Sequence, residues 1–211
     1  GITPLGIPPF FRSFLGYFNP FVPVTTLMYE EGVAGGYLVG DESGQDYLFL
    51  DPFFRDSALV DLTNPQALDW LDSWLSVAAN ELGIDGWMAD FAEWLPHDAL
   101  MFSGESGWEM HNRYPLEWQR ASRRVLSQAH EEGEEEEDNW IFFARSGWAS
   151  TQGGTGGISP TMWGGDQNTD WEYDDGLPTT VPIALHAGLS GVAVVGTDIA
   201  GFASTVSPPT T

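Results

Sequence analysis

The sequence of 211 residues contains no cysteine and no lysine. The absence of cysteine excludes disulfide bonds and thiolate metal sites, and it leaves the redox compartment open. No apolar run approaches the roughly 20 residues that a membrane-spanning helix needs, and the first residues carry no signal-peptide pattern. We therefore expect a cytoplasmic protein with no membrane partner.

Positive charge of any kind is scarce. The seven arginines face 31 acidic residues, which gives a net charge of −24 and an isoelectric point of about 4.1. A nucleic-acid partner is disfavoured because a phosphate backbone needs a basic face. The carboxylates are scattered, and the sequence has no calcium-loop pattern, no zinc-spaced histidines and no glycine-rich nucleotide motif. The sequence implies no metal and no organic cofactor.

An acidic protein without lysine is typical of adaptation to high salt. Carboxylates keep such a surface hydrated, and salt screens the repulsion between them. A GC-rich genome would also deplete lysine, but it should enrich arginine, which is scarce here. We predict a halophilic source, and we interpret the acidic run at residues 131–138 as a solvated turn.

The chain is rich in apolar and aromatic residues, at 42% and 14%, so it can bury a sizeable core. Short apolar runs alternate with stretches of helical periodicity. Asn64 followed by Pro65 predicts a helix start, and Gly83 predicts its end. The predicted strands are residues 14–22, 84–90, 140–146, 161–166 and 191–198, and the predicted helices are residues 65–82, 115–130 and 178–188.

Four of these five predicted strands end in a charged or polar residue, as the active-site rim of a (β/α)8 TIM barrel requires. Five strands are fewer than the eight of a complete barrel. We therefore expect residues 1–211 to be part of a single catalytic barrel domain, truncated at both ends. Residues 23–60 are expected to form a loop or hairpin insertion. An open α/β sheet is the structural alternative.

Two carboxylates at strand ends could act together. Asp90 and Asp166 end different predicted strands, and a pair of carboxylates flanking the scissile bond is what glycoside hydrolysis uses. Asp198 ends a third strand, with a supporting or a substrate-binding role, and Arg145 could pair with one of the carboxylates. Three tryptophans are candidates for stacking on a sugar ring or for core packing: Trp87, Trp94 and Trp163.

Alternation along residues 86–90 divides the first of these strands into two faces. Gly86, Met88 and Asp90 share one face, and Trp87 and Ala89 share the other. If the first face lines a barrel, the Asp90 carboxylate lies at its mouth.

Five blocks of sequence resemble, in order, the barrel motifs of family 31 glycoside hydrolases. They are GWMADFAEWLP, HNRYPLEW, FFARSGW, MWGGDQNTDWEYDDGLP and SGVAVVGTDIAGF. The closest branch is the bacterial sulfoquinovosidase-like α-glucosidases, and LGYFNPF and DLTNPQA also fit it. The resemblance covers nearly the whole chain and implies a retaining α-glycosidase acting on a small carbohydrate.

The resemblance also implies a role for individual residues. Asp90 matches the nucleophile and Asp166 the general acid/base. Arg145 matches an arginine that contacts the nucleophile region and a sugar hydroxyl, and Trp163 matches an aromatic wall. Asp198 and Glu93 match supporting acidic positions.

One departure from the branch concerns the substrate. A tyrosine of the branch, which helps to hold a sulfonate, is replaced by Phe202, and this favours a neutral α-glucoside over a sulfoquinovoside. An α-xylosidase or an α-transglycosylase would share both carboxylates, and an inactive carbohydrate-binding fragment is the non-enzymatic alternative. A homo-oligomer is compatible with the sequence.

Overall fold

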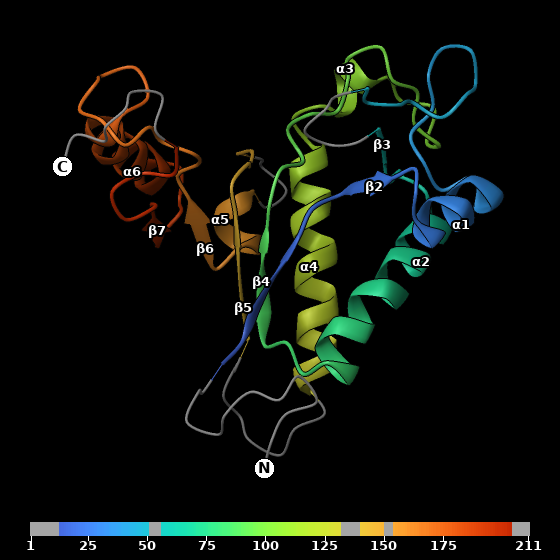
Figure 1. Ribbon diagram of the computed structural model, residues 1–211, viewed down its shortest axis with the longest axis horizontal. Coiled ribbons are helices and arrows are strands. Elements are labelled where there is room, and N and C mark those ends of the chain that lie inside the picture. Colours follow the sequence, from blue (N-terminus) through green and yellow to red (C-terminus); the bar gives the residue numbers. More distant parts are fainter. Residues whose placement is uncertain (1–12, 51–55, 132–139, 150–153, 204–211) are drawn as a thin grey trace.

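The computed structural model describes residues 13–50, 56–131, 140–149 and 154–203. From residue 132 on, the acidic run falls outside these ranges. The described chain is built on a five-stranded parallel sheet with the strand order β1-β4-β5-β6-β7 (Figure 1). The strands are β1 (Leu15–Phe18), β4 (Gly86–Ala89), β5 (Ile141–Ala144), β6 (Thr161–Trp163) and β7 (Val195–Gly196). Each lies inside a predicted strand, and the sheet with its helices is a partial (β/α) barrel, as expected.

Helices connect the strands, as parallel pairing requires. Between β1 and β4 lie α2 (Pro65–Ser76) and a π-helical turn η1 (Val77–Glu81), and α4 (Tyr114–Glu131) precedes β5. The side chain of Asn64 caps α2 by accepting from the Gln66 amide at 2.9 Å, as predicted. The C-terminal part contains α5 (Thr155–Ile158), η2 (Leu177–Thr179) and α6 (Thr180–Leu189). No helix in the described ranges has the length and apolar character to span a bilayer.

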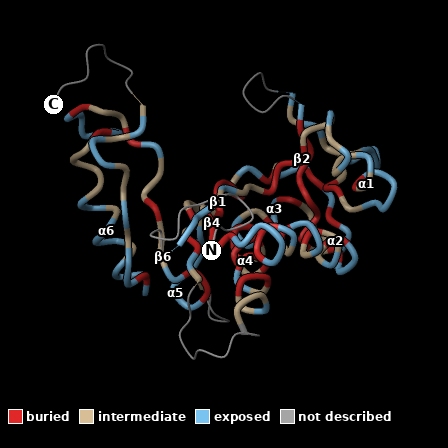
Figure 2. The backbone as a smooth tube through the Cα atoms, turned by 60° about the horizontal axis from the view of Figure 1, so that its bottom comes forward, coloured by how far each residue is buried: buried red, intermediate tan, exposed pale blue. Residues whose placement is uncertain are grey.

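The two faces of the sheet differ in burial. Trp87, Ala89, Phe142 and Ala144 are at most 1% exposed, because their face packs against the helical layer. The register aligns Tyr17, Met88 and Phe143 on the opposite, inner face. Figure 2 shows buried positions concentrated around α2, α4 and β2, whereas α6 contains no buried residue. The core therefore lies between the sheet and the helices, and the inner face is open.

The region between β1 and α2 departs from the sequence-based prediction. The expected strand 14–22 is split at Asn19-Pro20 into β1 and β2 (Phe21–Pro23), and β2 pairs antiparallel with β3 (Ser57–Leu59). Helix α1 (Leu27–Gly35), capped by the Thr26 hydroxyl, was not predicted. Its apolar residues follow no helical stripe, so periodicity could not reveal it.

Candidate active site

Asp90 lies directly after β4, at the carboxyl edge of the sheet. Its amide donates to the Phe18 carbonyl at 2.9 Å, so the pairing of β1 with β4 extends up to this residue. The residue is only 4% exposed. Oδ1 accepts from the Phe91 amide at 2.9 Å, and Oδ2 accepts from the Tyr17 hydroxyl at 2.6 Å. Both oxygens are therefore held in place.

The backbone after Asp90 adopts an unusual conformation. Phe91 and Ala92 have φ angles of 59° and 82°, which residues with a side chain rarely adopt. The Ser146 hydroxyl, which follows β5, donates to the Phe91 carbonyl. Such backbone strain clusters at functional sites, where the surrounding structure holds it. The turn that aims Asp90 is thus fixed from the neighbouring strand.

Arg145 follows β5 and contacts three carboxylates. Its Nε lies 3.5 Å from Asp90 Oδ1, its Nη1 lies 3.2 Å from Asp166 Oδ2, and its Nη2 donates to Glu93 Oε1. The guanidinium carbon also lies 3.9 Å from the centroid of the Phe91 ring. Arg145 therefore brings Asp90 and Asp166 to one place, although they lie on strands separated by β5.

Asp166 lies in the loop after β6, with its side chain 42% exposed. Partial burial raises the pKa of its carboxyl, and the negative charges of Asp90, Asp198 and Glu93 raise it further. The positive charge of Arg145 opposes this rise. A carboxyl with a raised pKa keeps its proton at higher pH, which is what a general acid needs.

Trp163 and Asp198 form one wall of a hollow on the inner face of the sheet. The Trp163 indole donates to Asp198 Oδ1 at 3.1 Å, and Trp163 is 8% exposed. The hollow has a volume of about 360 Å³, and Met88, Phe143, Thr161 and Thr197 also line it. An aromatic ring beside a carboxylate suits a sugar, since the ring offers an apolar face and the carboxylate accepts from hydroxyls.

Two other predicted site residues lie differently. Trp87 is fully buried, and its indole donates to Ser122 of α4 at 3.1 Å. It faces the helical layer, away from Asp90, so it packs in the core and is not placed to stack on a sugar at Asp90. Phe202 is 62% exposed, and its amide donates at 2.7 Å to the carbonyl of Gln167, the residue after Asp166.

Sequence reasoning missed the role of Tyr17. This residue lies 73 positions before Asp90, and only the pairing of β1 with β4 brings its hydroxyl to the carboxylate. Burial and the hydrogen bond to Asp90 raise the pKa of Tyr17 well above its usual value, so the phenol stays protonated. The one sequence feature that pointed to Tyr17 was the alternation of the predicted strand, which places the side chains of Tyr17 and Asn19 on the same face.

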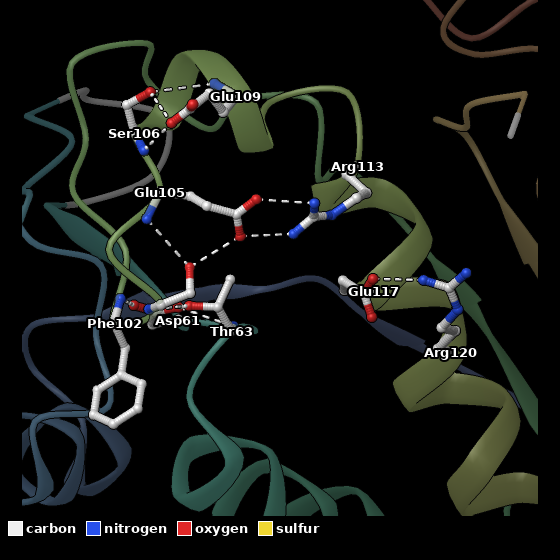
Figure 3. A network of polar contacts seen from close by, with 10 residues as sticks. Asp61, Thr63, Phe102, Glu105, Ser106, Glu109, Arg113, Glu117 and Arg120 are labelled. Carbon is white, nitrogen blue, oxygen red and sulfur yellow. Dashed lines mark hydrogen bonds and ion pairs between the residues drawn. The ribbon is translucent and has the colours of Figure 1, made fainter. Parts of the chain in front are cut away.

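A network of polar contacts anchors the loop that leads from the Asp90 strand to α4 (Figure 3). Buried Asp61 accepts from the Phe102 amide at 2.6 Å, and Arg113 contacts both oxygens of Glu105 at 2.9 and 2.8 Å. Ser106 and Glu109 form a capping box at the start of α3 (Gly107–Met110). The loop is thereby tied to the β3–α2 connection, and its own ends are joined through Arg113, the residue before α4.

No group of three or more histidine, aspartate or glutamate side chains in the described ranges could hold a metal ion.

Known proteins with similar sequences and structures share the barrel fold described above. Residues 12–210 match the glycosyl hydrolases family 31 TIM-barrel domain. A sulfoquinovosidase from Escherichia coli (strain K12) is 40% identical over 190 residues, which cover 90% of this chain and 26% of that protein. A sulfoquinovosidase from Agrobacterium fabrum is 35% identical over 192 residues, which cover 90% of this chain and 27% of that protein.

A solved structure is also similar. It is a family 31 sulfoquinovosidase from E. rectale in complex with an aza-sugar inhibitor. The TM-score is 0.81 at 34% identity, and the match covers 92% of this chain and 28% of that one. The chain thus spans about a quarter of the length of the curated relatives it matches. By sequence and by fold, this chain belongs to glycoside hydrolase family 31.

Proposed function

We propose that this chain supplies the two catalytic carboxylates of a retaining α-glycosidase that acts on terminal α-linked sugars. Asp90 is the nucleophile and Asp166 is the general acid/base. The observation that supports this best is the position of Arg145, whose guanidinium contacts both carboxylates. Two carboxyl groups facing one site are the minimum that double displacement requires.

In the first step, Asp90 attacks the anomeric carbon while the glycosidic bond breaks. Asp166 gives its proton to the leaving oxygen, and a glycosyl ester forms on Asp90. The raised pKa of Asp166 keeps this proton available until it is needed. Trp163 and Asp198 would face the sugar from the hollow on the inner side of the sheet.

In the second step, Asp166 takes a proton from water, and the water oxygen attacks the anomeric carbon. The ester bond breaks and Asp90 leaves as a carboxylate, so the configuration is retained overall. The negative charge of Asp90 is one of the causes that raise the pKa of Asp166. Esterification removes that charge, so the pKa of Asp166 falls in the intermediate and the group becomes a base.

Trapping tests the roles of the two carboxylates. The natural protein that contains this chain is incubated with a 5-fluoro glycosyl fluoride, and the labelled peptide is identified by mass spectrometry. We expect a label on Asp90 and loss of turnover in Asp90→Ala. A label on another carboxylate, or substantial activity in Asp90→Ala, would overturn the assignment.

Two substrates are supported by different observations. The similarity to two sulfoquinovosidases favours an α-sulfoquinovoside. Phe202 favours a neutral α-glucoside, because its exposed ring offers no hydroxyl to a sulfonate. We place the sulfoquinovoside first, because the similarity extends over 90% of the chain whereas the contrary signal is one residue.

Aryl α-sulfoquinovoside and aryl α-glucoside, compared by kcat/KM, separate the two substrates. Phe202→Tyr sharpens the comparison, since it adds a hydroxyl without changing the ring. If the sulfoquinovoside is the substrate, Phe202→Tyr should raise its kcat/KM relative to that of the glucoside. A wild-type preference for the glucoside would refute our choice and leave the retaining mechanism intact.

A further inference from the structure

The hydroxyl of Tyr17 lies 2.6 Å from Asp90 Oδ2, and this contact carries an inference that rests on the proposed function. We propose that Tyr17 is a positioning residue that stabilises Asp90 as the leaving carboxylate of the second step. Tyr17 needs no contact with the substrate for this role. It acts through the oxygen of the nucleophile.

The neighbours of Tyr17 fix the direction of the hydrogen bond. The Asn19 amide nitrogen lies 3.4 Å from the Tyr17 oxygen, and an amide nitrogen can only donate. The phenol oxygen therefore accepts from Asn19, and its single proton points to Asp90. Asn19 is held in turn, because its Oδ1 accepts from the Phe21 amide at 3.0 Å.

The two oxygens of Asp90 have different partners. Oδ1 accepts from the Phe91 amide, in the turn after β4, and forms an ion pair at 3.5 Å with Nε of Arg145, which follows β5. Oδ2 receives the Tyr17 hydroxyl, which comes from β1. Removing the hydroxyl would leave Oδ2 without this donor in a residue only 4% exposed.

This arrangement favours one half of the reaction. A hydrogen bond from a neutral donor is roughly twice as strong to a carboxylate as to a neutral ester. Tyr17 therefore stabilises Asp90 before the first step and again as the ester bond breaks. Its loss should slow the second step, in which the carboxylate re-forms. The first step consumes the carboxylate. Without the hydrogen bond the carboxylate is less stable and therefore more reactive, and this gain offsets the loss of positioning in that step.

Tyr17→Phe tests this role with an aryl glycoside that has a good leaving group. When breakdown of the intermediate limits turnover, kcat and KM fall together and kcat/KM changes little. We expect kcat to fall by about tenfold to a hundredfold, on the scale of a hydrogen bond to a charged group. Reactivation of the fluoro-glycosyl enzyme should slow by a similar factor.

Tyr47→Phe is the matched control. It removes a hydroxyl that also donates to a carboxylate, at 3.2 Å from Oδ1 of Asp98, a residue that is not one of the site carboxylates. Its kcat and KM should equal those of the wild type. A merely structural defect in Tyr17→Phe would lower the active fraction, so that kcat falls with KM unchanged, and that result overturns the proposal.

A second series keeps the ring in place in case Tyr17→Phe does not fold. Fluorinated tyrosines at position 17 are progressively stronger hydrogen-bond donors, so reactivation should become faster along the series. Rates that do not respond to donor strength overturn the inference. If the wild-type protein is never trapped on Asp90, the proposed function fails. If it is trapped and Tyr17→Phe reactivates at the wild-type rate, only the inference about Tyr17 fails.

Discussion

Arg145 Nη1 lies 3.2 Å from Asp166 Oδ2, so the cation that faces the nucleophile also contacts the second carboxylate. This contact lowers the pKa of Asp166, against the stronger effect of burial. Arg145 therefore sets two properties at once. It counters the negative charge around Asp90, and it limits how far the pKa of Asp166 can rise.

Arg145→Gln should affect both properties. We expect kcat/KM to fall by about a hundredfold to a thousandfold, as for the loss of one preorganised electrostatic contact. Removing the positive charge raises the pKa of Asp166, so the alkaline limb of the pH profile should move to higher pH. Arg120→Gln is the control, since Arg120 pairs with Glu117 on α4, 2.5 Å away and outside the site. An unchanged alkaline limb in Arg145→Gln would contradict this account.

Asp166→Asn removes the group that titrates. The alkaline limb of kcat/KM reports loss of the Asp166 proton, so the variant should lose this limb altogether. Aryl substrates with good leaving groups should still form the intermediate, because they need no proton. Added azide should then restore turnover as glycosyl azide of retained configuration. Exposed Asp174 lies in the same connection, and Asp174→Asn should keep the wild-type pH profile and show no rescue.

Asp61→Asn tests the anchoring of the loop after the Asp90 strand. Asp61 is 2% exposed and accepts at 2.6 Å from the Phe102 amide, while Thr63 donates to its other oxygen at 2.9 and 2.6 Å. An amide cannot accept at both ends, so we expect a loss of about 1–3 kcal/mol in the free energy of unfolding. Hydrogen exchange of the Phe102 amide should become faster. Asp98→Asn, at the surface, should change the free energy by no more than about 0.5 kcal/mol.

Salt dependence follows from the net charge of −24. Repulsion among the carboxylates opposes folding, and dissolved ions screen it. The midpoint of thermal unfolding should therefore rise as potassium chloride increases from low to molar concentration. Equal midpoints at both concentrations would contradict adaptation to high salt.

Local patterns predicted the parts of the structure that depend on neighbouring residues. The alternation around Asp90 and the strand ends at Arg145 and Asp166 placed these residues on one edge of a sheet, where the structure has them. The same alternation put Trp87 on the opposite face, which the structure shows packed against α4. Residue type alone made Trp87 a candidate for sugar binding, whereas the alternation pattern already indicated that it faces away from Asp90.

Contacts between distant residues could not be predicted in this way. The hydrogen bond from Tyr17 to Asp90 spans 73 residues and depends on which strands are neighbours in the sheet. The anchoring of Phe102 by Asp61 depends on tertiary packing in the same way, across 41 residues. Helix α1 was missed for a different reason, because its apolar residues show no helical period.

The surroundings of Asp90 also bear on how the protein folds. Asp90 follows β4, accepts from Tyr17 on β1 and forms an ion pair with Arg145 after β5, so the nucleophile acquires its geometry only when β1, β4 and β5 have paired. Pairings between residues this far apart in sequence form late and slowly. Recovery of activity after dilution from denaturant should therefore lag behind the return of the helical circular dichroism signal. The rate at which activity returns would then report the rate at which the sheet is completed.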